Sequence, residues 1–196
     1  MLTDAGRPLL SGRRVNLVPV KPEDYQAIYE LETSATNLAR WRYGGRTPSP
    51  DEVFRSLWDG VLAQFAVRSV SKDRFLGYVN IHDADLMNGT AKLAGIATQE
   101  TRGTGLLVDG FAILLNYTFR TFPIRKIYAE VNEFNLDQIA SSVGTLLLEE
   151  GRLVDHVYFN ERYWDRYILA ISRDHWKASC AEITRFALGD DPAPQP

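Results

Sequence analysis

A short glycine-rich turn, Arg102-Gly103-Thr104-Gly105, follows an apolar stretch and precedes an amphipathic one. Glycines let the main chain approach a bound group closely, and a helix that starts after them presents backbone N–H groups and the positive end of its dipole. Such a turn is typical of a site for a phosphate-bearing ligand. The alternative is a plain strand-to-helix turn, and the short motif alone does not decide between the two.

The segment after this turn is predicted to be a helix that ends near Pro123. Five residues of this segment fall at the spacing that places them on one face of a helix, namely Leu107, Phe111, Leu114, Leu115 and Thr118. The pattern therefore predicts that the turn lies at the start of a helix that packs on a core.

His82 is one candidate for proton transfer. It stands at the end of an expected strand, beside Asp83 and Asp85. An imidazole has an unperturbed pKa of about 6.5, which suits proton transfer near neutral pH. A lone histidine at a strand end is, however, more often a polar edge residue.

Glu130 is the second candidate for proton transfer. Strand alternation places Tyr128, Glu130 and Asn132 on one face of the expected strand 124–132. The alternative is a solvated or salt-bridged acid. An ordered water molecule also serves as a proton carrier in such reactions, so neither side chain is required as the base.

Further elements follow in the C-terminal half of the chain. A second helix is expected over residues 135–143, starting at Asn135. Glu150-Gly151-Arg152 then precedes an aromatic-rich strand through Tyr158 and Phe159, and a final strand is expected over residues 163–171.

Over residues 12–178 this arrangement resembles the GNAT superfamily of acyl-CoA-dependent N-acyltransferases, specifically the branch with the ribosomal-protein N-terminal acetyltransferases. The resemblance rests on several motifs, which are Arg102-x-x-Gly105, the segment 127–135, Glu150-Gly151-Arg152, Asp165-x-Tyr167-Ile168-Leu169 and Trp176. It implies transfer of an acetyl or other acyl group from acetyl-CoA or another acyl-CoA to a small-molecule or peptide amine, by direct attack and without a metal.

The resemblance also implies roles for individual residues. The donor pyrophosphate is expected at Arg102, Gly103, Thr104, Gly105 and Leu106, mostly through backbone N–H groups. Asn135 either contacts the pantetheine arm of the donor, caps the second helix, or does both, because asparagine is a good N-cap.

Two positions depart from the family pattern. Leu107 stands where a further Gly or Ala is usual, and it either faces the core or narrows the pyrophosphate groove. Ser142 stands seven residues after Asn135, where many members carry a tyrosine that serves the departing thiolate. A serine hydroxyl can donate a hydrogen bond to sulfur, and the alternative is a small residue that allows close packing.

The elements that must position these residues begin with a strand over residues 14–20 and a helix over residues 22–31. An aromatic loop over residues 33–48, suited either to an acceptor pocket or to a sheet edge, precedes a helix that starts at Ser49. Three strands are expected over residues 65–70, 75–82 and 91–97, with Asn88-Gly89 as a hairpin signal.

The predicted fold class is α/β (α+β), a GNAT-like mixed, mostly antiparallel central sheet of about seven strands flanked by helices. A single domain is expected over residues 13–187, after a flexible N-terminus (1–12) and before a mobile, disordered tail (188–196).

Composition agrees with a globular enzyme-sized domain, since 45% of the 196 residues are hydrophobic and 24% are charged. The net charge of −3 gives no global attraction to nucleic acid or to an anionic membrane. Cys180 is the only cysteine, so an intramolecular disulfide is excluded. With no signal peptide and no apolar membrane segment, a cytoplasmic protein without a membrane partner is expected.

Two alternatives stay open. The donor is either acyl-CoA or, in a second interpretation, an aminoacyl-tRNA or carrier-protein thioester. The phosphate contacts of a tRNA would then come from basic residues, which are Arg40, Arg42, Arg46, Arg120, Arg125 and Lys126. The third interpretation is a degenerate GNAT domain that binds a ligand without catalysis. A homodimer is compatible with each of these interpretations.

Overall fold

The computed structural model describes residues 10–188, except that the side chains of residues 180–186 are not described. The predicted flexible N-terminus lies mostly outside this range, as do the predicted tail beyond Leu188 and the side chain of Cys180. Residues 10–12 contact the first strand, where the Leu17 N–H donates to the Leu10 carbonyl at 2.8 Å.

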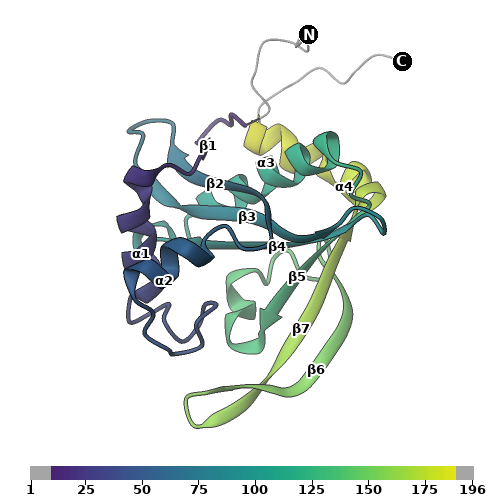
Figure 1. The fold of residues 1–196 in the computed structure, drawn as a ribbon. Coiled ribbons are helices and arrows are strands. Elements are labelled where there is room, and N and C mark those ends of the chain that lie inside the picture. The colour runs from purple at the N-terminus through teal and green to yellow at the C-terminus, as the bar shows by residue number, and fades with distance from the viewer. Residues whose placement is uncertain (1–9, 189–196) are drawn as a thin grey trace, which may run out of the picture.

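Seven strands form one sheet in the order β1-β2-β3-β4-β5-β7-β6 (Figure 1). Within the described residues every neighbouring pair is antiparallel except β4 and β5, which are parallel. The strands are β1 (Val15–Pro19), β2 (Val61–Ser69), β3 (Phe75–Asp85), β4 (Thr90–Ala97), β5 (Lys126–Asn132), β6 (Leu148–Phe159) and β7 (Arg162–Ser172). This architecture confirms the predicted fold class.

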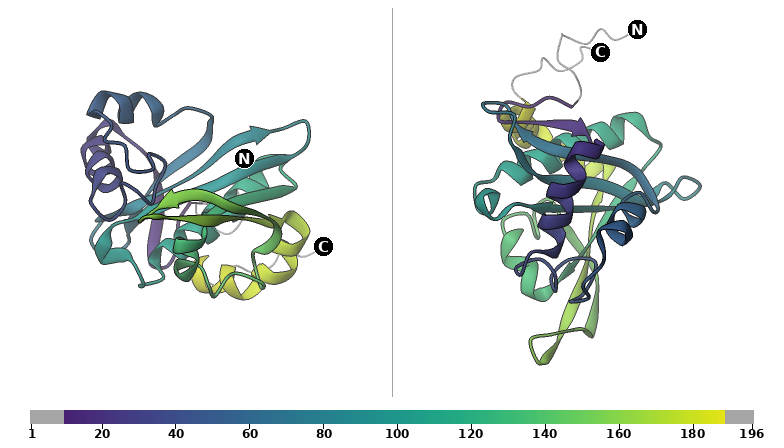
Figure 2. Two further views of the ribbon diagram at one scale, coloured as in Figure 1. Left: turned by 90° about the horizontal axis from the view of Figure 1, so that it is seen from below. Right: turned by 60° about the vertical axis from the view of Figure 1, so that its left-hand side comes forward.

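Helices cover both faces of the sheet, with α1 and α2 on one side and α3 and α4 on the other (Figure 2). The helices are η1 (Pro22–Asp24), α1 (Tyr25–Thr33), α2 (Pro50–Ser56), η2 (Gln99–Thr101), α3 (Leu106–Thr121), η3 (Glu133–Gln138) and α4 (Arg173–Leu188). The two sides are called below the α1 face and the α3 face. No helix in the described range is long and apolar enough to cross a membrane.

Each face of the sheet has its own hydrophobic cluster. On the α1 face, Ile28 and Leu57 pack with Tyr78 and Ile96 of the sheet. On the α3 face the larger cluster includes the buried residues of α3, namely Ala112, Ile113, Leu114, Leu115 and Phe119. The sheet is thus packed on both sides.

Several predicted elements are confirmed. The predicted helix after the glycine turn is α3, and its Leu114, Leu115 and Thr118 are buried. Ser49 caps α2, because its side chain accepts a hydrogen bond from the Glu52 N–H. The predicted hairpin at Asn88-Gly89 joins β3 and β4. The C-terminal helix α4, which was not predicted, follows directly on β7.

The prediction of a second helix over residues 135–143 is wrong. The chain forms the short 3-10 helix η3 and then a series of turns up to residue 147. After η3 begins, backbone bonds join residues three apart, from the Ile139 N–H to the Leu136 carbonyl at 2.9 Å and from the Ser142 N–H to the Ile139 carbonyl at 2.8 Å. Asparagine, aspartate and serine compete with helical backbone bonds, and Gly144 adopts a positive φ of 79°, so an α-helix does not form.

β4 and β5 pair only at their beginnings. The register joins Thr90 to Lys126 and ends with Lys92 beside Tyr128. Beyond Lys92, β4 remains paired with β3 up to Ala97. Residues 93–97 therefore have a strand on one side, but in the described part of the chain their pairing with β5 has ended.

Gly95 lets α3 lie close to the part of β4 that no longer pairs with β5. A Cβ atom added to Gly95 would lie 2.6 Å from the ring of Phe111 in α3 and 2.9 Å from Val79 in β3. Real Cβ atoms do not approach so closely, so only glycine allows the Phe111 ring to rest on the strand. Close helix–strand packing thereby sets where α3 begins.

Candidate active site

The turn before α3 has the backbone conformation that its glycines predict. After η2, Gly103 adopts a φ of 72°, and Gly105, the N-cap of α3, adopts a φ of 76°. Other residues reach this left-handed region at a cost, which explains why glycine occupies both positions. A Cβ at Gly103 would meet nothing within 4 Å, so the turn faces open space.

Hydrogen bonds inside the turn fix its shape. The N–H groups of Arg102 and Thr104 donate to the carbonyls of Thr98 and Thr101, each at 3.2 Å. The Thr104 hydroxyl donates to the Thr101 carbonyl at 2.6 Å and accepts from the Leu106 N–H at 3.3 Å. The turn is therefore preorganised, with the start of α3 directly behind it.

Arg14 anchors the start of α3 from the side of β1. Its Nε lies 2.6 Å from Oδ2 of Asp109, which is 3% exposed, and its Nη2 donates to the Gly105 carbonyl at 3.4 Å. The hydrogen bond from Arg14 to Asp109, more than their Coulomb attraction, raises the pKa of the guanidinium. An acid in the first turn also complements the helix dipole, so this pair holds the helix end in place.

Leu106 and Leu107 both pack, partly buried, against the core cluster of the α3 face. Leu107 therefore takes the core-facing alternative. Val108 is the exposed position of this first turn, with 47% of its surface accessible. The leucine at this position, where the family pattern has Gly or Ala, is thus accommodated by packing against the core.

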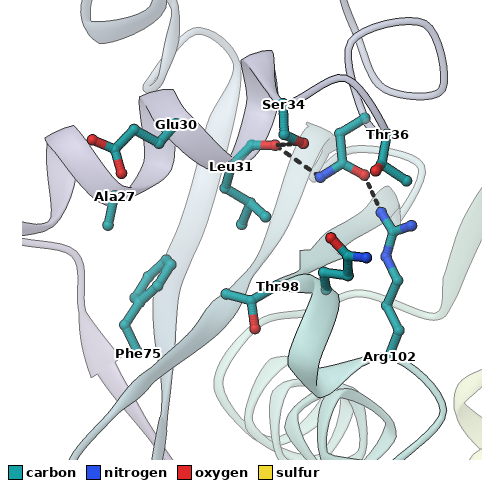
Figure 3. A pocket seen from close by; sticks show the side chains of 10 residues that line it. Ala27, Glu30, Leu31, Ser34, Thr36, Phe75, Thr98 and Arg102 are labelled. Carbon is teal, nitrogen blue, oxygen red and sulfur yellow. Dashed lines mark hydrogen bonds between the residues drawn. The ribbon is translucent and has the colours of Figure 1, made fainter.

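Arg102 points from the turn toward the α1–α2 segment, which comprises residues 34–49 (Figure 3). Its Nη2 donates a hydrogen bond to Oδ1 of Asn37. Burial, and secondarily the nearby charge of Arg40, lower the pKa of Arg102. Two guanidinium groups are thus held near the turn, where they favour an anionic ligand.

A pocket of about 290 Å³ lies between α1 and the turn. Ala27, Leu31 and Phe75 give it an apolar part, whereas Glu30 and Arg102 bring charges of both signs. The pocket adjoins the turn but is lined mainly by α1 and its following residues (Figure 3).

Asn135 joins the α1–α2 segment to η3 and does not cap a helix. Its Oδ1 accepts from Arg40 Nη1 at 3.3 Å, and its Nδ2 donates to the Arg40 carbonyl at 3.3 Å. The N-cap of η3 is Asn132. The expectation of a capping role for Asn135 is therefore wrong, because the helix that it would cap does not form.

A buried carboxylate anchors the same segment to α1. Glu32 is fully buried, and it accepts hydrogen bonds from Tyr78 and, at 3.3 Å and 3.1 Å, from Trp41 and Arg42. Burial, and then the charge of Glu32, raise the pKa of Tyr78 well above its ordinary value. The hydrogen bonds of Trp41 and Arg42 with Glu32 thus hold the α1–α2 segment against the α1 face of the sheet.

A row of charges crosses the α1 face where β4 and β5 separate. Lys92 of β4 lies 2.9 Å from Glu130 of β5 and 3.3 Å from Asp83 of β3. Arg166 of β7 lies 3.5 Å from the other oxygen of Glu130 and donates to Asn132 at 2.9 Å. The prediction that Glu130 and Asn132 share one strand face is confirmed by these contacts, and both oxygens of Glu130 are bound to cations.

His82 belongs to the same row, since it lies beside Lys92 in the register of β3 and β4. Its Nδ1 lies 3.4 Å from Oδ2 of Asp83, and 28% of its side chain is exposed. Asp83 therefore links both candidates for proton transfer, through His82 directly and through Lys92 to Glu130.

Ser142 lies in the turns that return from η3 toward β6. Its carbonyl accepts from the N–H groups of Leu146 and Leu147 at 3.0 Å and 2.8 Å. The predicted position of Ser142 on the second turn of a helix is lost with that helix. Its role toward a thiolate stays a prediction.

The sequence reasoning missed Asn37, Lys92 and Arg166. Lys92 and Arg166 sit in strands at alternating positions that face the same side as Glu130, so alternation alone was a usable signal for them. No local pattern marks Asn37. In the described residues no group of three His, Cys, Asp or Glu side chains is arranged to hold a metal ion.

Comparison with protein families identifies a match over residues 14–141 to the acetyltransferase (GNAT) domain. The putative ribosomal N-acetyltransferase YdaF of Bacillus subtilis (strain 168) is 21% identical over an alignment of 168 positions that covers 81% of this chain and 91% of YdaF. The spermidine N(1)-acetyltransferase of Escherichia coli (strain K12) is 23% identical over an alignment of 176 positions that covers 86% of this chain and 91% of that protein.

Solved structures show the same fold. A spermidine N-acetyltransferase from Vibrio cholerae in complex with CoA and spermine superimposes with a TM-score of 0.72 at 22% identity, covering 84% of this chain and 98% of the other. A GNAT-family acetyltransferase from Bacillus anthracis gives a TM-score of 0.67 at 15% identity, covering 84% and 98% of the two chains.

Proposed function

The chain belongs to the acetyltransferase (GNAT) family and is an N-acyltransferase, and we propose that it transfers an acetyl group from acetyl-CoA to a small-molecule primary amine. The observation that carries this proposal is the turn before α3, with its two left-handed glycines and two neighbouring arginines. A pyrophosphate with two negative charges is attracted by the positive end of the helix dipole and by the guanidinium charges, and it accepts hydrogen bonds from the backbone N–H groups.

The proposed phosphate site uses three of the five residues expected from the sequence, and the other two support the turn. The N–H groups of Gly103 and Gly105 bind the pyrophosphate oxygens, while Arg102 adds a charged contact. Because Thr104 and Leu106 are engaged inside the turn, they hold its shape. A bound phosphate competes with Asn37 for the Arg102 guanidinium.

The pantetheine arm would lie along residues 93–97 of β4, where pairing with β5 has ended. An arm that contains amide groups can hydrogen-bond to a strand edge much as an added peptide strand does. This placement brings the thioester to the charged row of the α1 face. Asn135, beyond the end of β5, is proposed to contact the same arm.

In the proposed reaction the amine nitrogen attacks the thioester carbonyl, a C–N bond forms, and the C–S bond breaks. The amine loses one proton and the departing CoA thiolate gains one, so the products are an amide and free CoA. We assign the amine proton to His82, because Glu130 is already bound by Lys92 and Arg166. Ser142 remains the proposed hydrogen-bond donor to the sulfur.

The acceptor is proposed to be a small-molecule amine because two relatives carry spermidine N-acetyltransferase activity in their names. A protein N-terminus is the second candidate, supported by the name of YdaF. A cytoplasmic location, the absence of a metal and a homodimer remain predictions.

Little supports the alternative of a tRNA-bound donor. Arg125 and Lys126 lie at the start of β5, whereas Arg40 contacts Phe134 and Asn135 beyond its end. Lys126 is paired with Glu150 at 2.6 Å. A tRNA backbone would therefore have to reach both ends of β5 and displace Glu150 from Lys126, which favours acyl-CoA as the donor in our proposal.

The experiment is an acetylation assay with acetyl-CoA and separate acceptors: spermidine, spermine, a panel of small primary amines, and a peptide with a free N-terminus. Release of the CoA thiol and the mass of the product are both recorded. We expect an acetylated small amine, and a fall in kcat in His82→Gln while acetyl-CoA binding persists. Binding of CoA without any product would instead support the degenerate, non-catalytic domain.

A further inference from the structure

Two buried amide side chains, Gln64 of β2 and Asn80 of β3, leave polar atoms unsatisfied on the α1 face. They are 4% and 9% exposed, and Asn80 Nδ2 donates to Gln64 Oε1 at 3.2 Å. Gln64 Nε2 and Asn80 Oδ1 are also buried but have no hydrogen-bond partner. A buried polar atom without a partner destabilises the fold, so such a pair requires either a bound water molecule or a ligand group to complete its hydrogen bonds.

Reassigning the amide orientations does not remove this deficit. If the oxygen and nitrogen are exchanged in both amides, Gln64 Nε2 donates to Asn80 Oδ1. Gln64 Oε1 and Asn80 Nδ2 are then the two atoms without a partner. In either orientation the pair offers one donor and one acceptor. The matching ligand group must therefore both accept and donate a hydrogen bond.

The pair lies at the boundary between the core and the proposed reaction site. Along one face of β3, Tyr78 is 1% exposed and Asn80 is 9% exposed, whereas 28% of the His82 side chain is exposed. Asn80 is in register with Gln64 on one side and with Ala94 of β4 on the other. Ala94 is only partly buried. It lies two residues after Lys92, the last residue of β4 that pairs with β5.

We propose that Gln64 and Asn80 bind the acceptor, and that they select amines that carry a hydroxyl or amide group a few bonds from the reacting nitrogen. The proposal rests on the proposed function, because it places the acceptor between Asn80 and His82 beside Ala94. The hydroxyl or amide of the acceptor donates to the free oxygen of the pair and accepts from its free N–H.

The same chemistry disfavours polyamines. The second ammonium group of a diamine only donates hydrogen bonds, so it leaves the N–H of the amide pair unpaired and brings a charge beside it. An alkylamine satisfies neither atom. A site that is built to hydrogen-bond a polar group discriminates strongly against analogues that lack it, because its own buried polar atoms then stay unpaired.

The experiment compares three acceptors of equal chain length: 3-aminopropanol, butylamine and 1,3-diaminopropane. The double variant Gln64→Met/Asn80→Leu replaces both amides by apolar side chains of similar shape. The control is Thr118→Val, which removes the hydroxyl of another buried side chain, one that donates to the Leu114 carbonyl at 2.7 Å. The readout is the ratio of kcat/KM between acceptors, together with the midpoint of thermal unfolding.

In the wild type we expect kcat/KM for 3-aminopropanol to exceed the value for each of the other two acceptors by about tenfold, the effect of one net hydrogen bond. The double variant should bring these ratios close to one without lowering the unfolding midpoint, and Thr118→Val should keep the wild-type ratios. Unchanged ratios in the double variant, or a wild type that prefers the diamine, would overturn the proposal.

A binding readout separates this proposal from the proposed function. Titration of the wild type and the CoA complex with 3-aminopropanol should shift the side-chain amide resonances of Gln64 and Asn80 in a ¹⁵N–¹H spectrum, whereas butylamine should leave them in place. If these shifts occur without turnover, the acceptor site stands and the catalytic proposal fails. If acetylation occurs without the shifts, the acceptor site fails and the catalytic proposal stands.

Discussion

Arg102, in the turn before α3, donates a hydrogen bond to Oδ1 of Asn37, in the segment between α1 and α2. Asn37 is 4% exposed, and its Nδ2 donates to the Leu31 carbonyl at 2.8 Å. The proposed phosphate site and the segment that covers the α1 face are thus joined through one side chain. A donor phosphate at the proposed site would compete with Asn37 for the Arg102 guanidinium.

Replacing Asn37 by alanine should therefore tighten binding of CoA. The guanidinium is then free for the pyrophosphate, and the gain should approach tenfold in the dissociation constant, because a hydrogen bond to a charged group contributes about 1.5 kcal/mol or more. Calorimetric titration with CoA measures the change. Ser34→Ala is the control, since Ser34 also donates to the Leu31 carbonyl, at 3.0 Å, but does not bond Arg102. Weaker binding in Asn37→Ala than in the control would contradict the competition.

Gly103→Ala should raise the KM for acetyl-CoA, because it strains the turn that forms the phosphate site. Gly144→Ala is a matched control: its φ of 79° is close to the 72° of Gly103, and neither position has an atom within 4 Å of an added Cβ. Both variants should lose about 1 kcal/mol of unfolding free energy through backbone strain. Urea unfolding and steady-state kinetics check the pair. An equal change in KM in both variants would argue against the turn as the donor site.

Gly95→Ala should destabilise the protein by about 1–3 kcal/mol, the usual cost of overpacking. The new Cβ would lie 2.6 Å from the Phe111 ring, so α3 must move away from β4. The same substitution in a Phe111→Leu background should cost less, because the ring that it meets is gone. Chemical denaturation of the four proteins gives the coupling. Additive losses would mean that Phe111 does not set the helix position.

Asp165, in the β6–β7 strand pair, should make the stability of the protein fall at acidic pH. The N–H of Asp155, at 2.8 Å, and then Arg152 lower the pKa of this carboxyl below its ordinary 3.8. A lowered folded-state pKa contributes stability that is present above the ordinary value and is lost as the pH falls toward the folded one. The stability advantage of the wild type over Asp165→Asn should thus be constant near neutrality and shrink below about pH 4. Thermal unfolding across pH tests this, and a gap that widens in acid would refute the assignment.

The sequence predicted those parts of the fold that depend on local patterns. The 3.6-residue periodicity of α3, the capping serine before α2 and the Asn88-Gly89 hairpin are all local, and each was confirmed. Strand alternation likewise placed Glu130 and Asn132 on one face. The resemblance to a known family then supplied the mixed, mostly antiparallel sheet of about seven strands, whereas the order of the strands came only from the structure.

Features that depend on tertiary structure were missed or predicted wrongly. A helix was predicted over residues 135–143, but their polar side chains and Gly144 favour turns. The contact of Arg102 with Asn37 joins residues 65 positions apart, and no spacing rule reveals it. The deficit at Gln64 and Asn80 is visible only once the register of β2 and β3 places the two amides together.

The central claim is that the turn before α3 holds the phosphates of acetyl-CoA. Calorimetric titration of acetyl-CoA into the wild type and into Arg102→Gln, each at low and high salt, tests it most directly. We predict binding in the micromolar range for the wild type, weakened about tenfold or more in Arg102→Gln, and a weaker salt dependence in the variant because one charged contact is lost. No binding to the wild type, or equal affinity and salt dependence in both proteins, would contradict the claim.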